Sequence, residues 1–134
     1  MSINVNRARH GLLMLVLGLF AFNASAASSS VQDQLEAYAS QGADVANAGN
    51  GKRLWTLKNG QRSCSSCHGE SAREVGRHVK TGKVIQPMAL SVNGERYGNA
   101  KKVEKWFRRN CKWTFGRACS VQEKADMLTW LANE

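Results

Sequence analysis

The sequence predicts a small all-α domain, in which three or four helices are joined by long loops. Apolar residues recur at steps of three and four positions over residues 31–46, 100–109 and 121–131, which is the periodicity of helices that bury one face. No segment shows the alternation of a half-buried strand, and no internal repeat is present. With 134 residues, the chain is long enough for one domain and not for two.

The first element is a predicted secretory signal peptide over residues 1–26. A positively charged start precedes an apolar stretch over residues 11–22, which ends near a small-x-small cleavage site whose last residue is Ala26. This stretch is shorter than the about 20 residues of a membrane-spanning helix, which disfavours a retained anchor. We therefore expect export to the periplasm and a mature domain of residues 27–134.

The mature chain begins with a predicted helix whose apolar face consists of Val31, Leu35, Tyr38, Ala39, Gly42, Val45 and Ala46. Asparagine and glycine at residues 47–51 are expected to end this helix as a C-cap. A further helical turn over residues 52–57 would present Leu54 and Trp55, and Asn59-Gly60 predicts a turn.

The middle of the chain predicts loops with short helical turns. Residues 71–99 contain several glycines and the only proline, Pro87, and show no sustained periodicity. A helix is expected over residues 100–109. The last helix begins after Ser120, because an N-cap serine followed three positions later by Glu123 forms a capping box.

One motif accounts for the long loops. Cys64-Ser65-Ser66-Cys67-His68 is C-x-x-C-H, the sequence that attaches a c-type haem. Its two thiols can add to the two vinyl groups along one edge of the porphyrin, and the histidine that follows can ligate the iron. We expect one covalent haem c, held by Cys64 and Cys67 with His68 on its iron. Loops can wrap such a cofactor, whereas three helices alone bury little core.

Three other interpretations of the motif are weaker. A thioredoxin-like C-x-x-C is expected near a βαβ pattern, which the sequence lacks. A zinc site would need further ligands, and only His78 and a distant cysteine pair are available. A structural disulfide between Cys64 and Cys67 would leave His68 without a role. Export, the helical pattern and Gly69 directly after the histidine favour haem.

The charge of the chain indicates the kind of partner. It has 19 Lys and Arg residues against ten Asp and Glu residues, a net charge of +9. The signal peptide contains Arg7 and Arg9 and no acidic residue, so its removal lowers the net charge from +9 to +7. Such a surface favours an acidic redox partner that is steered electrostatically. Nucleic acid is disfavoured because the protein is exported.

With this motif in place, the layout resembles class I cytochromes c over nearly the whole mature chain. A helix leads into Leu54-Trp55, the haem motif follows early, and a proline loop and a C-terminal helix complete the chain. The resemblance implies that the two terminal helices cross. It also implies that the carbonyl of Pro87 accepts the second N–H of His68, which would fix the tautomer of that ring.

The sixth iron ligand is not the methionine usual for class I proteins, which would lie about ten residues before the last helix. Met127 lies within that helix, where it is more simply a packing residue. Met88 follows Pro87, a position typical of a residue that packs on the haem, and it is the alternative ligand. His78 is more simply a loop histidine.

The segment over residues 105–113, with the second cysteine pair, resembles the sphaeroides haem protein type, an oxygen-binding branch of class I cytochromes c. The resemblance implies that Asn110 is the sixth ligand and that Cys111 forms a disulfide with Cys119. It also implies a dihaem cytochrome c as redox partner, alongside a membrane cytochrome b. The other interpretation of Asn110 is a helix C-cap, to which asparagine is suited.

An asparagine ligand would have consequences for function. A carboxamide oxygen is a hard, neutral, weak donor that suits ferric iron better than ferrous iron. On reduction Asn110 would leave, which opens a site for O2, NO or CO. The alternative function is a plain electron carrier whose sixth ligand, Met88, stays bound. The sequence shows no evident general acid or base, so it does not decide whether the protein also turns over O2 or NO.

Overall fold

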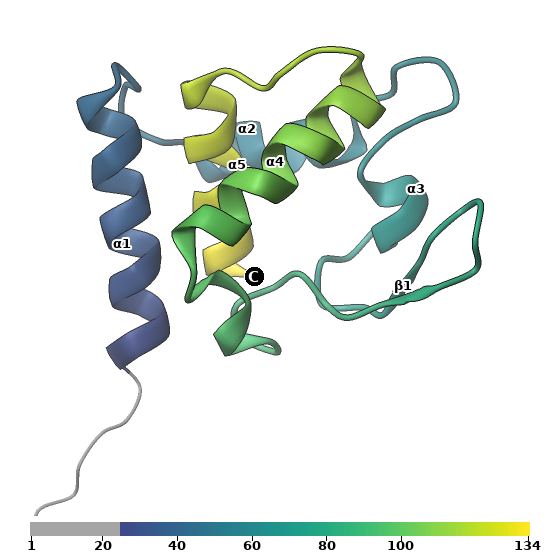
Figure 1. Cartoon of the computed structure of the whole chain (residues 1–134), viewed down its shortest axis with the longest axis horizontal. Coiled ribbons are helices and arrows are strands. Elements are labelled where there is room, and N and C mark those ends of the chain that lie inside the picture. Colours follow the sequence, from purple (N-terminus) through teal and green to yellow (C-terminus); the bar gives the residue numbers. More distant parts are fainter. Residues whose placement is uncertain (1–24) are drawn as a thin grey trace, which may run out of the picture.

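A computed structural model describes residues 25–134 (Figure 1). Its helices are α1 (Ser25–Ser40), α2 (Ala48–Thr56), α3 (Ser65–His68), α4 (Ala100–Phe115) and α5 (Val121–Asn133). The strands β1 (Gly76–Arg77) and β2 (Val84–Ile85) and a 3-10 helix (Gly94–Tyr97) lie between α3 and α4. The mostly helical class predicted from the sequence is confirmed. Residues 1–24 of the predicted signal peptide lie outside the described part. Among the described residues, no helix is long and apolar enough to span a membrane.

Helix α1 is shorter than the periodicity predicted. It ends at Ser40, and Gly42 follows with a φ of 97° that turns the chain away. The predicted face stops there, since Val45 is 94% exposed. Val31 and Tyr38 are buried where α1 packs beside α5, on one side of the molecule (Figure 1).

The segment expected to end the first helix instead begins the next one. Asn47 has extended backbone angles, and its side chain accepts a hydrogen bond from the backbone N–H of Asn50, so it is the N-cap of α2. The prediction of a C-cap at residues 47–51 was therefore wrong. Asparagine is common both as an N-cap and as a C-cap, and here a tertiary contact favours the N-cap. The buried carboxylate of Asp126 accepts hydrogen bonds from Asn47 N at 2.7 Å and from Asn50 Nδ2 at 3.2 Å.

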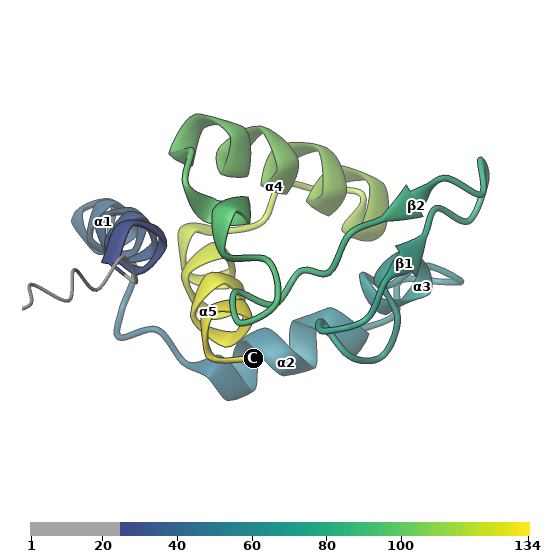
Figure 2. The same cartoon turned by 90° about the horizontal axis from the view of Figure 1, so that it is seen from below.

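Helices α2 and α5 cross at close range (Figure 2). A Cβ atom on Gly51 would lie 2.2 Å from the carbonyl oxygen of Asp126, so only glycine allows this approach. Trp55 and Leu128 are almost fully buried in the core. The resemblance to class I cytochromes c implied a crossing of the first and last helices, and the structure places the close crossing at α2, with α1 as an additional helix.

The middle of the chain contains a short antiparallel hairpin that the sequence did not predict. Gly76 pairs with Ile85 and Arg77 pairs with Val84. Strands of two residues are too short to show a periodicity, so packing determines this pairing. A Cβ atom on Gly76 would lie 2.3 Å from the carbonyl oxygen of Cys67, which shows how closely β1 lies on α3 (Figure 2).

Helix α4 extends to Phe115 instead of ending at residue 109. Asn99 is its N-cap and Gly116, with a φ of 71°, is its left-handed C-cap. Asn110 therefore lies inside the helix, and the interpretation of Asn110 as a C-cap was wrong. Helix α5 begins with the predicted capping box, in which the Ser120 and Glu123 side chains each accept the other residue's backbone N–H.

Candidate functional site

A cavity of about 740 Å³ lies among α3, the hairpin, α4 and α5. This volume is within the range of about 300–1,000 Å³ found for small-molecule and cofactor sites. The walls are largely apolar and include Leu54, Ile85, Val103, Trp106, Phe107 and Leu131. All four residues predicted to hold or ligate the haem line this one cavity: Cys64, Cys67, His68 and Asn110.

A serine pair shapes the one-turn helix α3. The backbone N–H of Ser66 donates to Ser63 Oγ at 3.1 Å, and the backbone N–H of Ser63 donates to Ser66 Oγ at 3.0 Å. Gly69, with a φ of 85°, ends the turn. Cys64 and Cys67 are free thiols, and burial raises the pKa of Cys64 to about 11. The turn thus presents two thiols and a histidine to the cavity.

His68 is held in the form that can ligate a metal. Burial, and then the positive charge of Arg96, lower the pKa of His68 to about 4, so its ring is neutral at physiological pH. A metal-ligating histidine must be neutral. The ring of Trp55 lies 5.3 Å from the His68 ring between centroids, and Trp55 Nε1 donates to Gly69 O at 2.9 Å. These contacts fix the ring beside the cavity.

The expected hydrogen bond from His68 to Pro87 is not found. The carbonyl of Pro87 accepts instead from Asn93 Nδ2 at 2.9 Å, and the buried Nδ1 of His68 has no hydrogen-bond partner. The resemblance did not predict this, because it gave no role to Asn93, whose side chain reaches back six residues.

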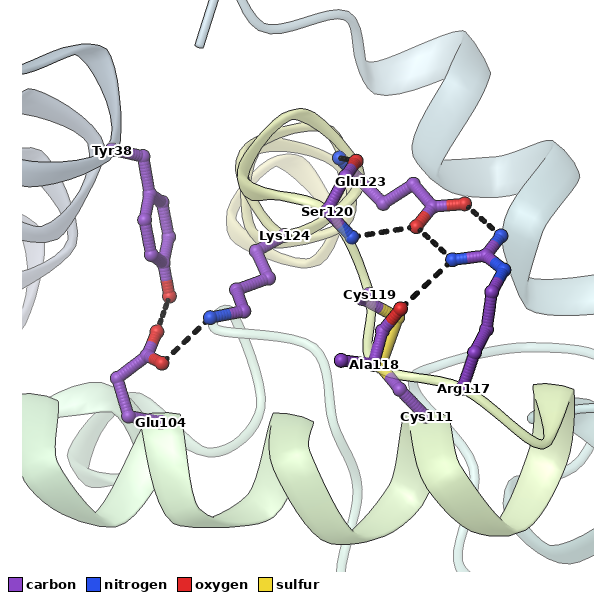
Figure 3. Close-up of a disulfide and its surroundings, with 9 residues drawn as sticks. All are labelled: Tyr38, Glu104, Cys111, Arg117, Ala118, Cys119, Ser120, Glu123 and Lys124. Carbon is purple, nitrogen blue, oxygen red and sulfur yellow. Dashed lines mark hydrogen bonds and ion pairs between the residues drawn. A yellow bond between two sulfur atoms is a disulfide. The ribbon is translucent and has the colours of Figure 1, made fainter. Parts of the chain in front are cut away.

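Asn110 lies on the face of α4 that borders the cavity. It shares that face with Trp106, four residues before it, and Trp113, three residues after it, and all three line the cavity. The next residue, Cys111, forms the implied disulfide with Cys119, with Cα atoms 5.6 Å apart. Figure 3 shows this bond joining α4 to the segment that enters α5.

The two other candidate ligands are Met88 and His78. Met88 also lines the cavity, but its backbone N–H donates to Ala72 O at 2.8 Å, close in the chain to His68 on α3. Met88 is thus tied to the segment that follows α3, whereas Asn110 lies on α4, a different wall of the cavity. His78 Nδ1 accepts from the N–H groups of Lys80 and Thr81 at 3.3 Å each. His78 also lines the cavity, and these two hydrogen bonds occupy the lone pair of its Nδ1.

The residues present fit a haem and not a zinc ion. Among residues 25–134, no group of three or more His, Cys, Asp or Glu side chains could hold a metal ion by itself. Two free thiols, one neutral histidine and a large apolar cavity match a porphyrin that brings its own iron.

Sequence reasoning missed two residues beside the cavity. Tyr97 lines it, is buried, and donates a hydrogen bond from its hydroxyl to the carbonyl of Met88. Arg96 stacks on Trp106, with its guanidinium carbon 4.4 Å from the ring centroid. Both belong to the 3-10 helix, which has too few residues to leave a periodic signal.

Comparisons with known proteins agree with this site. A family model described as "Domain of unknown function (DUF1924)" matches residues 41–131. The cytochrome c-type protein SHP of Cereibacter sphaeroides is 35% identical over 124 residues, which cover 89% of this chain and 95% of that protein. Cytochrome c'' of Methylophilus methylotrophus is 35% identical over 83 residues, covering 62% of this chain and 58% of that protein.

Two solved structures extend the likeness to three dimensions. Oxidized SHP, described as an oxygen-binding cytochrome c, matches with a TM-score of 0.71 and 37% identity over 78% of this chain and 96% of that one. The solution structure of M. methylotrophus cytochrome c'', described in terms of haem-ligand detachment, matches with a TM-score of 0.67 and 30% identity. That match covers 81% of this chain and 93% of the other.

Proposed function

Because this chain belongs to the family of c-type cytochromes that includes the protein SHP, we propose that it is an exported monohaem cytochrome c whose reduced form binds a diatomic gas. Electron transfer would be coupled to the release of Asn110 from the iron. The observation that carries this proposal is the position of Asn110, on the cavity face of α4 and not at a helix end.

One haem c would be attached through Cys64 and Cys67, since the chain has a single C-x-x-C-H motif. His68 would be one axial ligand and Asn110 the other. When bound, the haem supplies the one-electron redox change and the iron site at which O2, NO or CO can bind. The location would be the periplasm, as the predicted signal peptide and the c-type cytochrome family together suggest.

The structure of α4 suits a ligand that leaves. Backbone hydrogen bonds hold the helix on both sides of Asn110, and the disulfide holds the neighbouring Cys111 to Cys119. Release of Asn110 would then need only a rotation of its side chain, with no unfolding of the helix. A neutral amide is a weak ligand for ferrous iron, so reduction would favour that rotation. The haem-ligand detachment described for M. methylotrophus cytochrome c'' supports a detachable ligand in this family.

The outer face of α4 suits an acidic redox partner. Lys101, Lys105, Arg108 and Lys112 follow one another at steps of four, three and four residues, so they form one exposed row, here called the α4 basic stripe. Trp106, Phe107 and Asn110, which line the cavity, lie on the other face of the same helix, and Lys112 at the end of the stripe also lines the cavity. An acidic partner on this stripe would lie close to the haem. The resemblance implies that this partner is a dihaem cytochrome c, and indirectly a membrane cytochrome b.

Acid–base turnover is no part of the proposal, because Glu123, an acidic side chain on the cavity wall, is paired with Arg117.

The absorption spectrum of the reduced holoprotein with and without CO tests the gas-binding function. We expect a high-spin ferrous spectrum that changes at once on addition of CO. A low-spin ferrous spectrum that is indifferent to CO would instead support the plain electron carrier, in which Met88 stays bound.

A matched pair of variants tests the ligand. Asn110→Ala should make the ferric haem high-spin or water-ligated, because the amide donor is lost, while the reduced protein still binds CO. Met88→Leu, a volume-conserving change in the same cavity, should leave the ferric spectrum unaltered. The reverse pattern, measured by absorption and electron paramagnetic resonance, would show that Met88 is the ligand.

A further inference from the structure

Arg96 differs from the other arginines of the described chain in its surroundings. Between residues 25 and 134 it is the one arginine that is half-buried, whereas the others are exposed. Its guanidinium lies over the ring of Trp106, at 4.4 Å from the centroid. Burial lowers the pKa of Arg96, which reflects the cost of removing its charge from water.

This half-buried charge has no anionic partner among the described residues. Neither of the two ion pairs in that part of the chain involves Arg96, and its buried Nε has no hydrogen-bond partner. Arg62 is a useful comparison. It also lies over a cavity-lining tryptophan, Trp113, but it is exposed and donates to the Trp113 carbonyl at 3.0 Å. A half-buried guanidinium without a partner is costly, so an anion at Arg96 is expected.

The part of α4 that Arg96 contacts, at Trp106, indicates which anion this is. The Cys64 thiol lies against Thr114, near the C-terminal end of α4, whereas Arg96 lies against Trp106. Eight helical residues separate these two points, which is about 12 Å along the helix axis. In a haem the propionates lie at the edge opposite the two vinyl groups. If the vinyl edge is held at Cys64 and Cys67 and the haem lies along α4, its propionate edge would face Trp106 and Arg96.

We propose that Arg96 binds a haem propionate and that Trp106 supports its guanidinium by stacking. This inference rests on the proposed attachment of haem at Cys64 and Cys67. Arg96 is then a positioning residue: its N–H donors fix the propionate edge of the haem and neutralise one carboxylate. A cation there disfavours the ferric state, so Arg96 raises the midpoint potential, in opposition to the amide ligand Asn110.

Resonance Raman spectroscopy of the holoprotein tests this inference directly, because the frequency of the propionate bending band depends on the hydrogen bonds of the propionate. In Arg96→Gln we expect this band to shift to lower frequency, because a charge-assisted hydrogen bond is lost, and the midpoint potential to fall. In Arg96→Lys, which keeps the charge without the planar fork, we expect a smaller band shift and a potential close to the wild-type value. Arg108→Gln, the same charge change at an exposed position of α4, should leave the band in place.

The outcomes separate the possible failures. An unchanged band in both Arg96 variants, in protein whose haem is covalently attached, overturns the inference and leaves the proposed function standing. A wild-type protein without covalent haem, shown by the pyridine haemochrome assay, overturns the proposed function itself. If the band stays in place and the potential of the wild type follows added chloride or phosphate, Arg96 binds an external anion and the propionate assignment is wrong. If Arg96→Gln fails to fold, the propionate band of Arg96→Lys still tests the inference: a shifted band supports it and an unchanged band overturns it.

Discussion

At the scale of single residues, two glycines of α2 face different surroundings. A Cβ atom on Gly51 would lie 2.2 Å from the carbonyl oxygen of Asp126 and 2.7 Å from Trp130 Cβ, both on α5. A Cβ atom on Gly49 would lie 3.1 Å from Asn47 Oδ1 and 3.7 Å from an Arg53 nitrogen, which are ends of side chains. The backbone of α5 cannot give way as a side chain can, so only Gly51 is indispensable for the crossing.

Gly51→Ala should therefore lower the free energy of unfolding by about 1–3 kcal/mol or more, because the added methyl group forces α2 away from α5. Gly49→Ala is the matched control. Its gain in helix propensity of up to about 1 kcal/mol is offset by the tight contact with Asn47, so we expect a small change. Urea unfolding of the two holoprotein variants measures both. Equal stabilities would show that the crossing tolerates a side chain.

At the scale of elements, α4 has two chemically different faces. The inner face carries Asn110 and the aromatic wall of the cavity, and the outer face carries the α4 basic stripe. The disulfide closes a short loop after Asn110 and contributes about 2–3 kcal/mol in the chain-entropy model. A partner bound to the stripe would thus contact the helix that carries Asn110, the proposed iron ligand.

Charge reversal on the stripe tests this arrangement. In Lys105→Glu/Arg108→Glu, reduction of the ferric protein by reduced flavodoxin, an acidic one-electron donor, should slow by about tenfold or more at low ionic strength. The rate should also lose most of its salt dependence, because the attraction is removed. Stopped-flow absorption of the haem band measures both quantities.

The control for that experiment makes the same change of charge elsewhere, in Lys80→Glu/Lys83→Glu at the exposed tip of the hairpin. Its rate should fall much less. Photoreduced riboflavin, an uncharged donor, should reduce all three proteins at the same rate if their haem sites are intact. An equal loss of rate in both double variants would show that net charge matters and the stripe does not.

At the scale of the whole molecule, one polar network joins α1, α4 and α5 (Figure 3). Lys124 Nζ on α5 donates to Glu104 Oε2 on α4 at 2.8 Å, and the Tyr38 hydroxyl on α1 donates to Glu104 Oε1. Burial opposes the ionisation of Glu104, but the hydrogen bonds from Lys124 and Tyr38 outweigh it and lower the pKa of this carboxyl. Burial and Glu104 raise the pKa of Tyr38 far above its usual value, so its hydroxyl stays a donor.

The lowered pKa of Glu104 predicts an acid-dependent stability. Its contribution is fully present above the ordinary Glu pKa of about 4.3 and is lost as the pH falls through the lower value in the folded protein. Glu104→Gln should cost less than about 1 kcal/mol at pH 7, because the half-exposed pair is screened by solvent. The difference in Tm from wild type should shrink below about pH 4.

Glu36→Gln, at an exposed position of α1, serves as the control, since no ion pair of the described residues involves Glu36. Its difference in Tm should be small at every pH. A Glu104→Gln difference that does not depend on pH would mean that the network stabilises through packing and not through charge.

Local features of the sequence determined much of this protein. The C-x-x-C-H spacing, the capping box at Ser120 and Glu123, and the 3.6-residue periodicity each lie within a few neighbouring residues, so they could be read directly. The resemblance to the sphaeroides haem protein type, carried by the segment around Asn110, is confirmed by the comparisons. The disulfide between Cys111 and Cys119 is present.

Only the tertiary structure decided what depends on contacts between distant residues. Asp126 makes Asn47 the start of a helix, Asn93 occupies the Pro87 carbonyl expected for His68, and Arg96 reaches Trp106 from a segment without periodicity. These partners lie between 6 and 79 positions apart in the chain, and no local pattern records such pairings. The physical reason is that a cap, a buried acceptor or a buried charge is stabilised by whatever group the fold brings to it.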